Sequence, residues 1–411
     1  MESAIISDIF SQSFSNRSKR LKASAIRELL KVSTQEGIIS FAGGTPDPAT
    51  FPTEEFAKIS ERVIKEEYKK SLQYSTTEGD GMLKDAYIEI LRKHDNIDWI
   101  ERDNMLVTTG SQQGLDLIGR IFINNGDDIA VELPTYLGAL TAYNVYGPNY
   151  HGIELEDDGL NVDQLEDLAK GLKREGKKLK FLYTITNFHN PAGVTMSLEK
   201  RKRVLKLAEE YDFFIVEDDP YGLLRFEGEK LPSLYYLNKG RRVILLNTFS
   251  KILAPGLRIG IIISNKEVIR KCVVAKQGAD LCGPAITQKI AGHFLHENDI
   301  KKQLDMIIKL YKEKKDIMLK ALDKYLGDVE GVSWTKPQGG LFLWVRLPKN
   351  IDSGEMFKEA VEKYKVAYIL GSAFYFNGEG KNTMRLCFAL PPKEIIPEGI
   401  KRLAELIKSK I

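Results

Sequence analysis

The sequence NTFSKILAPGLRIG, residues 247–260, brings several chemically active groups close together. It follows an apolar, strand-like run and carries two hydroxyls (Thr248 and Ser250), one lysine (Lys251) and one arginine (Arg258). Hydroxyls and a fork-shaped guanidinium suit a dianionic phosphate. A lysine between them is placed to form an imine with an aldehyde on the phosphorylated molecule. Taken alone, the stretch also fits a surface loop with a solvated lysine.

A phosphorylated aldehyde held on a lysine is pyridoxal phosphate (PLP), and its ring nitrogen needs an acid. The run FIVEDDPY, residues 214–221, reads as a buried strand that ends in acids. A carboxylate there can pair with the protonated pyridine nitrogen, which makes the ring an electron sink. The spacing to Tyr221, a donor for the phenolic oxygen, favours Asp218 over Asp219. The alternative is a turn whose acids are solvated.

Three other positions carry weaker signals. TGSQQG, residues 109–114, joins a strand to a helix, where free N–H groups and the Ser111 hydroxyl suit an anion. On its own, this motif fits better as a plain turn with Ser111 as the helix cap. Asn190 precedes a proline in a glycine-containing turn, so its amide is free to point at a ligand. Arg385 lies inside an apolar strand, where either a substrate α-carboxylate or a nearby Glu would be its partner.

Length and composition limit the class of protein. A chain of 411 residues, 43% hydrophobic and 28% charged, predicts two globular lobes. A net charge of +3 argues against a nucleic-acid partner. The first twenty residues lack a signal-peptide core, and no run reaches the length of a membrane span. Three scattered cysteines indicate reduced thiols, and the five histidines form no metal set. We therefore expect a cytoplasmic enzyme without a metal, nucleic-acid or membrane partner.

From about residue 105, short apolar runs alternate with amphipathic ones, which predicts a parallel α/β sheet. The predicted strands cover residues 105–108, 128–131, 181–184, 213–217, 243–247 and 258–263. The predicted helices between them cover residues 111–123, 136–145, 162–173 and 198–210. A second, smaller α+β lobe is predicted from helices at 301–325 and 392–409 and strands at 342–347, 366–368 and 383–388. A short amphipathic helix is expected at 24–32.

Seven motifs in order along the chain resemble those of the fold-type-I PLP enzymes, specifically the class I/II aminotransferases. The resemblance covers about residues 23–406. Any one motif is weak, but the ordered set is specific. The motifs are Leu72-Gln73-Tyr74, Gly110-Ser111-Gln112, Pro134-Thr135-Tyr136, Asn190-Pro191-Ala192-Gly193, Asp218-Asp219-Pro220-Tyr221, Ser250-Lys251 with Arg258, and Arg385.

This resemblance implies a fold and a set of roles. The expected fold is a large domain (43–317) with a mainly parallel seven-stranded sheet flanked by helices. A small α+β domain (318–411) and an N-terminal arm and helix (1–42) complete it. Lys251 would be the Schiff-base lysine, Asp218 would meet the pyridine nitrogen, and Tyr221 and Asn190 would hold the phenolic oxygen. Tyr136 would stack on the ring. The expected phosphate ligands are Ser111, Gln112, Thr248, Ser250 and Arg258.

The resemblance also implies the assembly and the reaction. In the family, the residue that matches Tyr74 reaches the phosphate of the neighbouring subunit's cofactor, so a homodimer with shared sites is expected. Lys251, displaced by the incoming amine, would act as the general base at the substrate's α-carbon. An amino group would move from an amino acid to a 2-oxo acid in two half-reactions, with ping-pong kinetics.

The substrate is suggested by the N-terminal region. ASAIRELL (23–30) and FAGG (41–44) are similar to 2-aminoadipate and aromatic (kynurenine-type) aminotransferases. In those enzymes the arginine that matches Arg27 meets a distal carboxylate or moves aside, although Arg27 beside Glu28 also fits a solvated helix position. Glutamate and 2-oxoglutarate are the expected shared pair, and aromatic, leucine-like and 2-aminoadipate side chains are the candidates for the other substrate. Besides Arg385 and Asn190, the expected substrate contacts are Ser24, Arg27, Gly43 and Gly44.

Two other functions compete with transamination. A PLP-dependent carbon–sulfur β-lyase would use the same lysine, acid and arginine, because the cofactor does the bond-breaking. Pyruvate and ammonia formed without an added 2-oxo acid would identify it. A non-enzymatic PLP-sensing regulator would carry a DNA-binding domain ahead of the PLP domain. The aminotransferase pattern begins by residue 23, so we do not expect such a domain.

Overall fold

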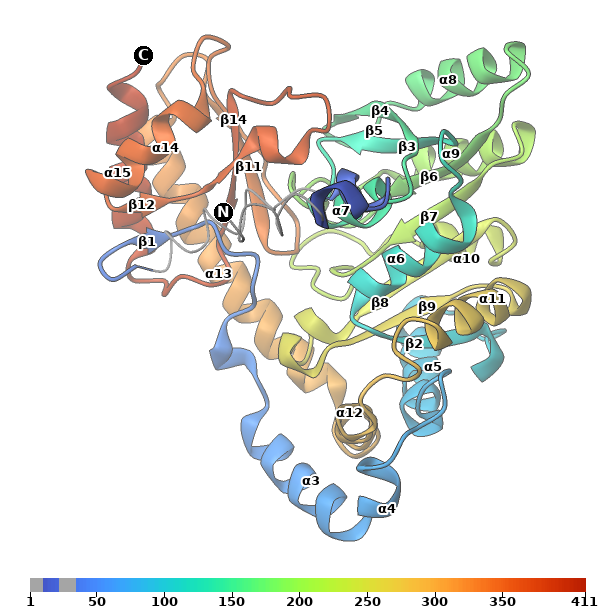
Figure 1. Cartoon of the computed structure of the whole chain (residues 1–411). Coiled ribbons are helices and arrows are strands. Elements are labelled where there is room, and N and C mark those ends of the chain that lie inside the picture. Colours follow the sequence, from blue (N-terminus) through green and yellow to red (C-terminus); the bar gives the residue numbers. More distant parts are fainter. Residues whose placement is uncertain (1–9, 22–34) are drawn as a thin grey trace, which may run out of the picture.

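A mostly parallel sheet of eight strands runs through the larger part of the protein, as the computed structural model shows for residues 10–21 and 35–411 (Figure 1). Strand β9 runs antiparallel to β2 and β8, β5 runs antiparallel to β4, and the other pairs are parallel. In spatial order the strands are β2 (Met105–Thr109), β9 (Ile259–Ile263), β8 (Val243–Thr248), β7 (Phe214–Asp218), β6 (Leu179–Thr184), β3 (Asp128–Leu133), β4 (Asn149–Glu156) and β5 (Gly159–Leu160).

The mainly parallel α/β fold is confirmed, and all six strands predicted for this sheet are present. Two strands at one end of the sheet, β4 and the edge strand β5, were missed. Strand β4 has only one buried residue, Ile153, so it lacks the continuous apolar run that marks a central parallel strand. Strand β5 is two residues long and follows β4 through a tight turn. Seven longer strands therefore match the expected count, and β5 adds the eighth.

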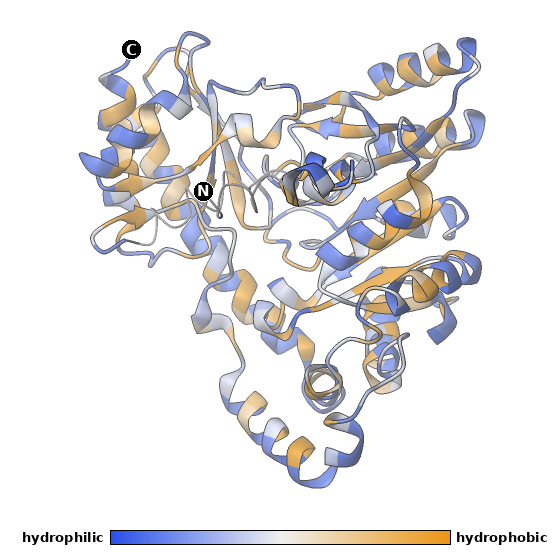
Figure 2. Cartoon of the chain, viewed as in Figure 1, coloured by the Kyte–Doolittle hydropathy of each residue, from blue (hydrophilic) through white to orange (hydrophobic). Residues whose placement is uncertain are grey.

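Helices cover both faces of the sheet, and apolar side chains fill both interfaces. Because successive side chains in a strand point to opposite faces, Ile215 joins one hydrophobic cluster and Val216 the other. Figure 2 shows the corresponding hydrophobic colouring of the central strands. The helices of this part are α5 (Gly81–Asp95), α6 (Ser111–Phe122), α7 (Leu137–Asn144), α8 (Val162–Arg174), α9 (Leu198–Glu210), α10 (Leu234–Asn238), α11 (Lys266–Gln277) and α12 (Ala285–Glu297).

A long helix, α13 (Ile300–Leu326), leads to a smaller C-terminal lobe with an antiparallel sheet in the order β10-β11-β14-β13. The chain after residue 35 joins this lobe, because β1 (Ile39–Ser40) pairs with β12 (Val366–Ala367). The lobe's other elements are β10 (Ser333–Trp334), β11 (Phe342–Arg346), β13 (Ile369–Leu370), β14 (Thr383–Cys387), α14 (Ser353–Glu362) and α15 (Ile396–Lys408). The domain boundaries at residues 42 and 317 stay predictions.

The remaining elements are short or peripheral. Helices α3 (Thr53–Glu66) and α4 (Tyr68–Ser71) pack on α12. Short 3-10 helices lie at Ser18–Arg20, Pro48–Thr50, Arg102–Asn104, Phe249–Lys251, Pro255–Leu257 and Gly371–Phe374. The helix predicted at 24–32 falls outside the residues that the structure describes. Within the described part of the chain, no helix has the length and apolar character needed to cross a membrane.

Candidate active site

A cavity of about 720 Å³ lies between the carboxyl ends of strands β6, β7 and β8 and strands β11 and β14 of the C-terminal lobe. Ligand sites of open parallel sheets form at this edge. Twelve residues predicted for the site line this cavity. They are Gly44, Ser111, Gln112, Tyr136, Asn190, Asp218, Tyr221, Thr248, Ser250, Lys251, Arg258 and Arg385.

Lys251 lies on the short helix that directly follows β8, and its side chain points into the cavity. Its Nζ donates a hydrogen bond of 2.8 Å to the carbonyl oxygen of Gly44. Burial, together with the nearby guanidinium charges of Arg385 and Arg258, lowers the pKa of Lys251 to about 8. A neutral, nucleophilic amine is therefore accessible close to neutral pH.

Asp218 ends strand β7 and presents one free oxygen. Its Oδ2 accepts a hydrogen bond of 2.8 Å from the Tyr183 hydroxyl, whereas Oδ1 is buried without a partner among the described residues. Burial and the neighbouring Asp219 raise the pKa of Asp218 to about 7. Asp219 does not line the cavity, and its Oδ1 accepts from the Gly222 N–H. A buried, unsatisfied acceptor that aims at the cavity fits a protonated ring nitrogen.

Donors for an anion gather where β2, β8 and β9 meet helix α6. Thr248 Oγ1 lies 3.0 Å from Ser250 Oγ, and Ser111 Oγ lies 3.2 Å from the carbonyl oxygen of Asn247. The Arg258 guanidinium packs against Gly110, because a Cβ at that glycine would lie 2.5 Å from Arg258 Nη2. Gly110, not Ser111, caps helix α6, so the Ser111 hydroxyl is not used as a helix cap. These hydroxyls, the guanidinium and the helix N-terminus form a cradle that fits a phosphate.

Arg385 is held at the opposite wall by neutral partners. Its Nη1 donates to Asn190 Oδ1 at 3.0 Å and its Nη2 to the carbonyl oxygen of Ala42 at 2.9 Å. Its Nε has no partner, and Arg385 forms no ion pair with any residue that the structure describes. The guanidinium carbon lies 4.2 Å from the Phe342 ring centre and 5.1 Å from that of Phe374. A buried cation without an acid is ready for a carboxylate ligand.

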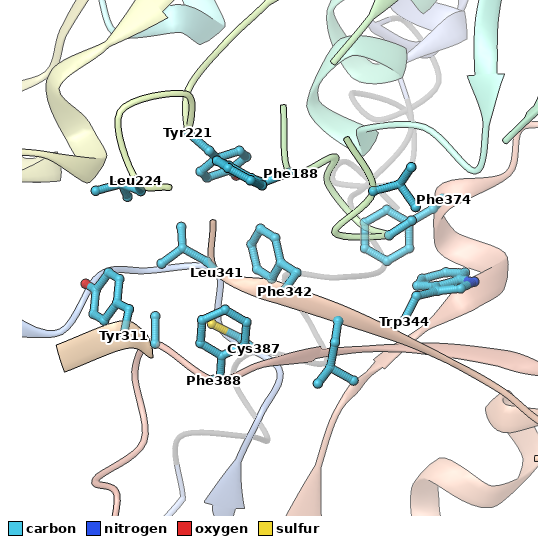
Figure 3. Close-up of a cluster of buried hydrophobic side chains, with 14 of the residues drawn as sticks. Phe188, Tyr221, Leu224, Tyr311, Leu341, Phe342, Trp344, Phe374, Cys387 and Phe388 are labelled. Atoms are coloured by element: carbon cyan, nitrogen blue, oxygen red, sulfur yellow. The ribbon is translucent and has the colours of Figure 1, made fainter. Parts of the chain in front are cut away.

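Asn190 connects Arg385 to Tyr221, because its Nδ2 lies 3.4 Å from the Tyr221 hydroxyl. Figure 3 shows Tyr221 above Phe342, and the two rings meet edge to face with 5.9 Å between their centres. Trp344 supports Phe374 from behind in a second edge-to-face contact. The wall around Arg385 is therefore a packed aromatic cluster.

The other predicted site residues lie elsewhere. Gly43 adjoins the cavity without lining it, and a Cβ there would lie 3.1 Å from Leu390. Tyr74 is 79% exposed on the loop after α4, outside the cavity of its own chain. Ser24 and Arg27 fall outside the described residues.

The sequence analysis missed Tyr183, Phe342, Phe374, Thr45 and Ile185. Tyr183 had a usable signal, because it lies on β6 beside the acid-ending strand β7, with Tyr183 opposite Val216 in the register. Its side chain therefore shares the face of Asp218, two residues beyond Val216. Phe342 and Phe374 come from apolar segments of the C-terminal lobe and had no signal of their own.

Comparison with known proteins agrees with this geometry. The family of class I and II aminotransferases matches residues 37–403. The aromatic-amino-acid aminotransferase 1 of Thermococcus litoralis is 49% identical, over 97% of this chain and 94% of its own. The 2-aminoadipate transaminase of Thermus thermophilus is 39% identical, over 97% of each chain.

A solved structure extends the agreement to three dimensions. The Pyrococcus horikoshii kynurenine aminotransferase, in complex with PMP, superimposes with a TM-score of 0.93 at 47% identity, over 98% of both chains. PMP is the amino form of PLP, and the cavity holds the lysine, acid and anion cradle that this cofactor needs. The chain therefore belongs to the class I and II aminotransferases and is a PLP-dependent aminotransferase.

Proposed function

We propose that this enzyme moves an amino group between an L-amino acid and 2-oxoglutarate, and that the amino acid has an aromatic, leucine-like, 2-aminoadipate or glutamate side chain. The observation that carries the proposal is Arg385, a buried guanidinium with neutral partners that shares a cavity with Lys251 and the free oxygen of Asp218. A carboxylate on Arg385 would hold the α-carbon of an amino acid inside this cavity.

Different residues of the cavity would bind the phosphate of the cofactor, hold its ring and transfer the proton. The phosphate of PLP would be bound by Arg258, Ser111, Gln112, Thr248 and Ser250. When PLP is bound, its ring supplies the electron sink for the electron pair left at the substrate's α-carbon.

Groups around the ring keep it in place and charged. Asp218 Oδ1 would accept from the ring nitrogen, and Tyr221 with Asn190 would hold the phenolic oxygen. Tyr136 would pack against the ring. The carboxylate of Asp218 would keep the ring nitrogen protonated, because an anion within hydrogen-bond distance favours the charged form of its partner.

Lys251 moves the proton. As a free amine, its Nζ would accept the proton of the substrate α-carbon. The low pKa of Lys251, about 8, supports this role, because a base with a pKa near the working pH is populated in its neutral form and still binds a proton. Arg385 holds the α-carboxylate so that the α-carbon stays within reach of Nζ.

The walls of the cavity support the range of side chains. Ile185, Phe342 and Phe374 offer apolar contacts, and Gly44 lies close enough to Phe342 that a Cβ would come within 3.2 Å of its ring. Such walls favour aromatic and aliphatic side chains. Arg27 and Ser24 remain proposed contacts for a distal carboxylate, together with the backbone at Gly43.

We also propose a cytoplasmic homodimer with shared sites, in which Tyr74 reaches the cofactor phosphate of the partner. The exposure of Tyr74, outside its own cavity, supports this arrangement. Membership of the aminotransferase family and the names of the relatives favour transamination over a carbon–sulfur β-lyase or a PLP-sensing regulator.

The visible absorption spectrum of the purified protein tests the proposal, with Lys251→Ala as the control. We expect a band of lysine-bound PLP that phenylalanine, leucine, 2-aminoadipate or glutamate converts to the pyridoxamine form and that 2-oxoglutarate restores. The control should lack the lysine-bound band. If sulfur amino acids yield pyruvate and ammonia without a 2-oxo acid while no amino acid gives the pyridoxamine form, the β-lyase function holds instead.

A further inference from the structure

Helix α12 holds both ends of the loop that carries Tyr74. This loop, taken here to include the short helix α4, runs from Glu67, between α3 and α4, to Asp80, the N-cap of α5. Between these ends Leu72, Gln73 and Tyr74 are exposed. In Figure 1, α4 lies at the lower end of the molecule, directly below α12.

A lysine on α12 bridges the two ends. Lys289 Nζ lies 3.3 Å from Glu67 Oε2 and 3.2 Å from Asp80 Oδ2. The side chains of Lys289 and Asp80 are only 15% and 13% exposed. An ion pair that is largely shielded from solvent is screened less by salt than an exposed one. His293, one turn further along α12, makes a second contact with Glu67.

The end of the loop at Asp80 is anchored by hydrogen bonds and close packing. The Asp80 N–H donates to Gln288 Oε1 at 2.8 Å, and Asp80 Oδ1 accepts from the Leu83 N–H at 3.0 Å. Gly79 has a φ of +95°, and a Cβ there would lie 2.4 Å from Val107. Lys289 therefore links Glu67, at the start of the loop, to a residue that is anchored at its end.

We infer that Lys289 is a positioning residue for the partner's active site. By tying Glu67 to Asp80 it sets the span of the loop and so places Tyr74. An exposed loop that had to be ordered on dimer formation would lose conformational entropy, and the bridge removes part of that cost beforehand. The inference rests on the proposed contact between Tyr74 and the partner's cofactor phosphate.

The test is a double-mutant cycle on the PLP-loaded dimer, with the rate of PLP release as the readout. Release is followed by loss of the absorption band in an excess of a PLP-trapping apoprotein. Sedimentation at the same protein concentration confirms that each variant is dimeric. Tyr74→Phe removes a hydrogen bond to a charged phosphate and should speed release about tenfold, which is about 1.4 kcal/mol. Lys289→Met should speed release by about threefold to tenfold, because it loosens the same contact.

The combination of the two variants is decisive. If Lys289 acts through Tyr74, adding Lys289→Met to Tyr74→Phe should change the rate of PLP release only slightly. Lys289→Arg keeps a cation that can bridge two carboxylates and should restore slow release. Lys65→Met is the matched control, because Lys65 is an exposed lysine paired with Glu61 on the same helix α3 and should release PLP at the wild-type rate.

Three results would overturn the inference. If Lys289→Met releases PLP at the wild-type rate while Tyr74→Phe releases it faster, the bridge does not place Tyr74. Fully additive effects would show that Lys289 acts by another route. If Tyr74→Phe releases PLP at the wild-type rate, Tyr74 does not have its proposed role, and the inference fails with it. If Lys289→Met does not fold, Asp80→Asn removes the charge at the other end of the bridge, keeps an oxygen that can accept from the Leu83 N–H, and is held to the same outcomes.

Discussion

The hydrogen bond from Tyr183 to Asp218 should set the pH range in which the enzyme binds its cofactor. The Tyr183 hydroxyl donates to Asp218 Oδ2 at 2.8 Å, and both side chains are buried. Burial and the neighbouring Asp219 raise the pKa of Asp218 to about 7 even though this bond lowers it. Tyr183→Phe removes a bond to a charged group, worth about 1.5–3 kcal/mol. At about 1.4 kcal/mol per pH unit, the pKa of Asp218 should rise by roughly one to two further units.

The assay is the affinity of the apoenzyme for PLP as a function of pH. The Asp218 carboxylate is charged above its pKa, and only the charged form pairs with a protonated ring nitrogen. Affinity should therefore fall as the pH drops through about 7 in the wild type, and the fall should begin roughly one to two units higher in Tyr183→Phe.

Tyr143→Phe is the matched control. Tyr143 is a buried neighbour of Tyr183, with 6.0 Å between the ring centres, and its hydroxyl has no hydrogen-bond partner among the described residues. Its loss should leave the pH profile unchanged. The same midpoint in Tyr183→Phe and in the wild type, with unchanged melting temperatures, would refute the reasoning.

Three further predictions follow from the same cavity. The rate of covalent attachment of PLP to the apoenzyme should increase with pH, with a midpoint near 8, because only the neutral amine of Lys251 can attack the aldehyde. Stopped-flow absorbance measures this rate, and a midpoint near 10.5 would contradict the lowered pKa. Gly110→Ala, which must keep a φ of +73° and meets Arg258, should weaken PLP binding by about tenfold or more, as equilibrium titration would show. Arg385→Lys loses two-point binding of the α-carboxylate and should raise the KM for amino acids about tenfold to a hundredfold in steady-state assays; an unchanged KM would place the carboxylate elsewhere.

There is a physical reason why residues predicted from separate motifs line one cavity. Asp218 ends a buried strand, and Lys251 and Asn190 follow two others. Buried strands are the segments whose apolar runs are plainest in a sequence. The carboxyl ends of parallel strands meet at one edge of the sheet, so residues that follow them come together without any knowledge of packing. Strand β4 was missed because it lies near the sheet edge and its side chains are mostly exposed or half-buried.

The partner of Arg385 could not be predicted from the sequence. From the sequence, a substrate carboxylate and an internal ion pair were both open. The structure brings Arg385 within 3.0 Å of Asn190, a residue 195 positions away, and gives it no acid among the described residues. Such a contact depends on how the C-terminal lobe packs against the sheet. No periodicity within either segment encodes it.

The sequence by itself determined the residue types of the candidate site and their order, because a lysine after a strand, an acid at a strand end and an arginine within an apolar strand are local features of the chain. Only the tertiary structure decided the pKa of Lys251, the free Oδ1 of Asp218 and the aromatic wall around Arg385. These properties follow from burial and from neighbours that are distant in sequence. Burial penalises charge, and a neighbour determines which atoms stay unpaired, so both exist only once the two lobes are packed.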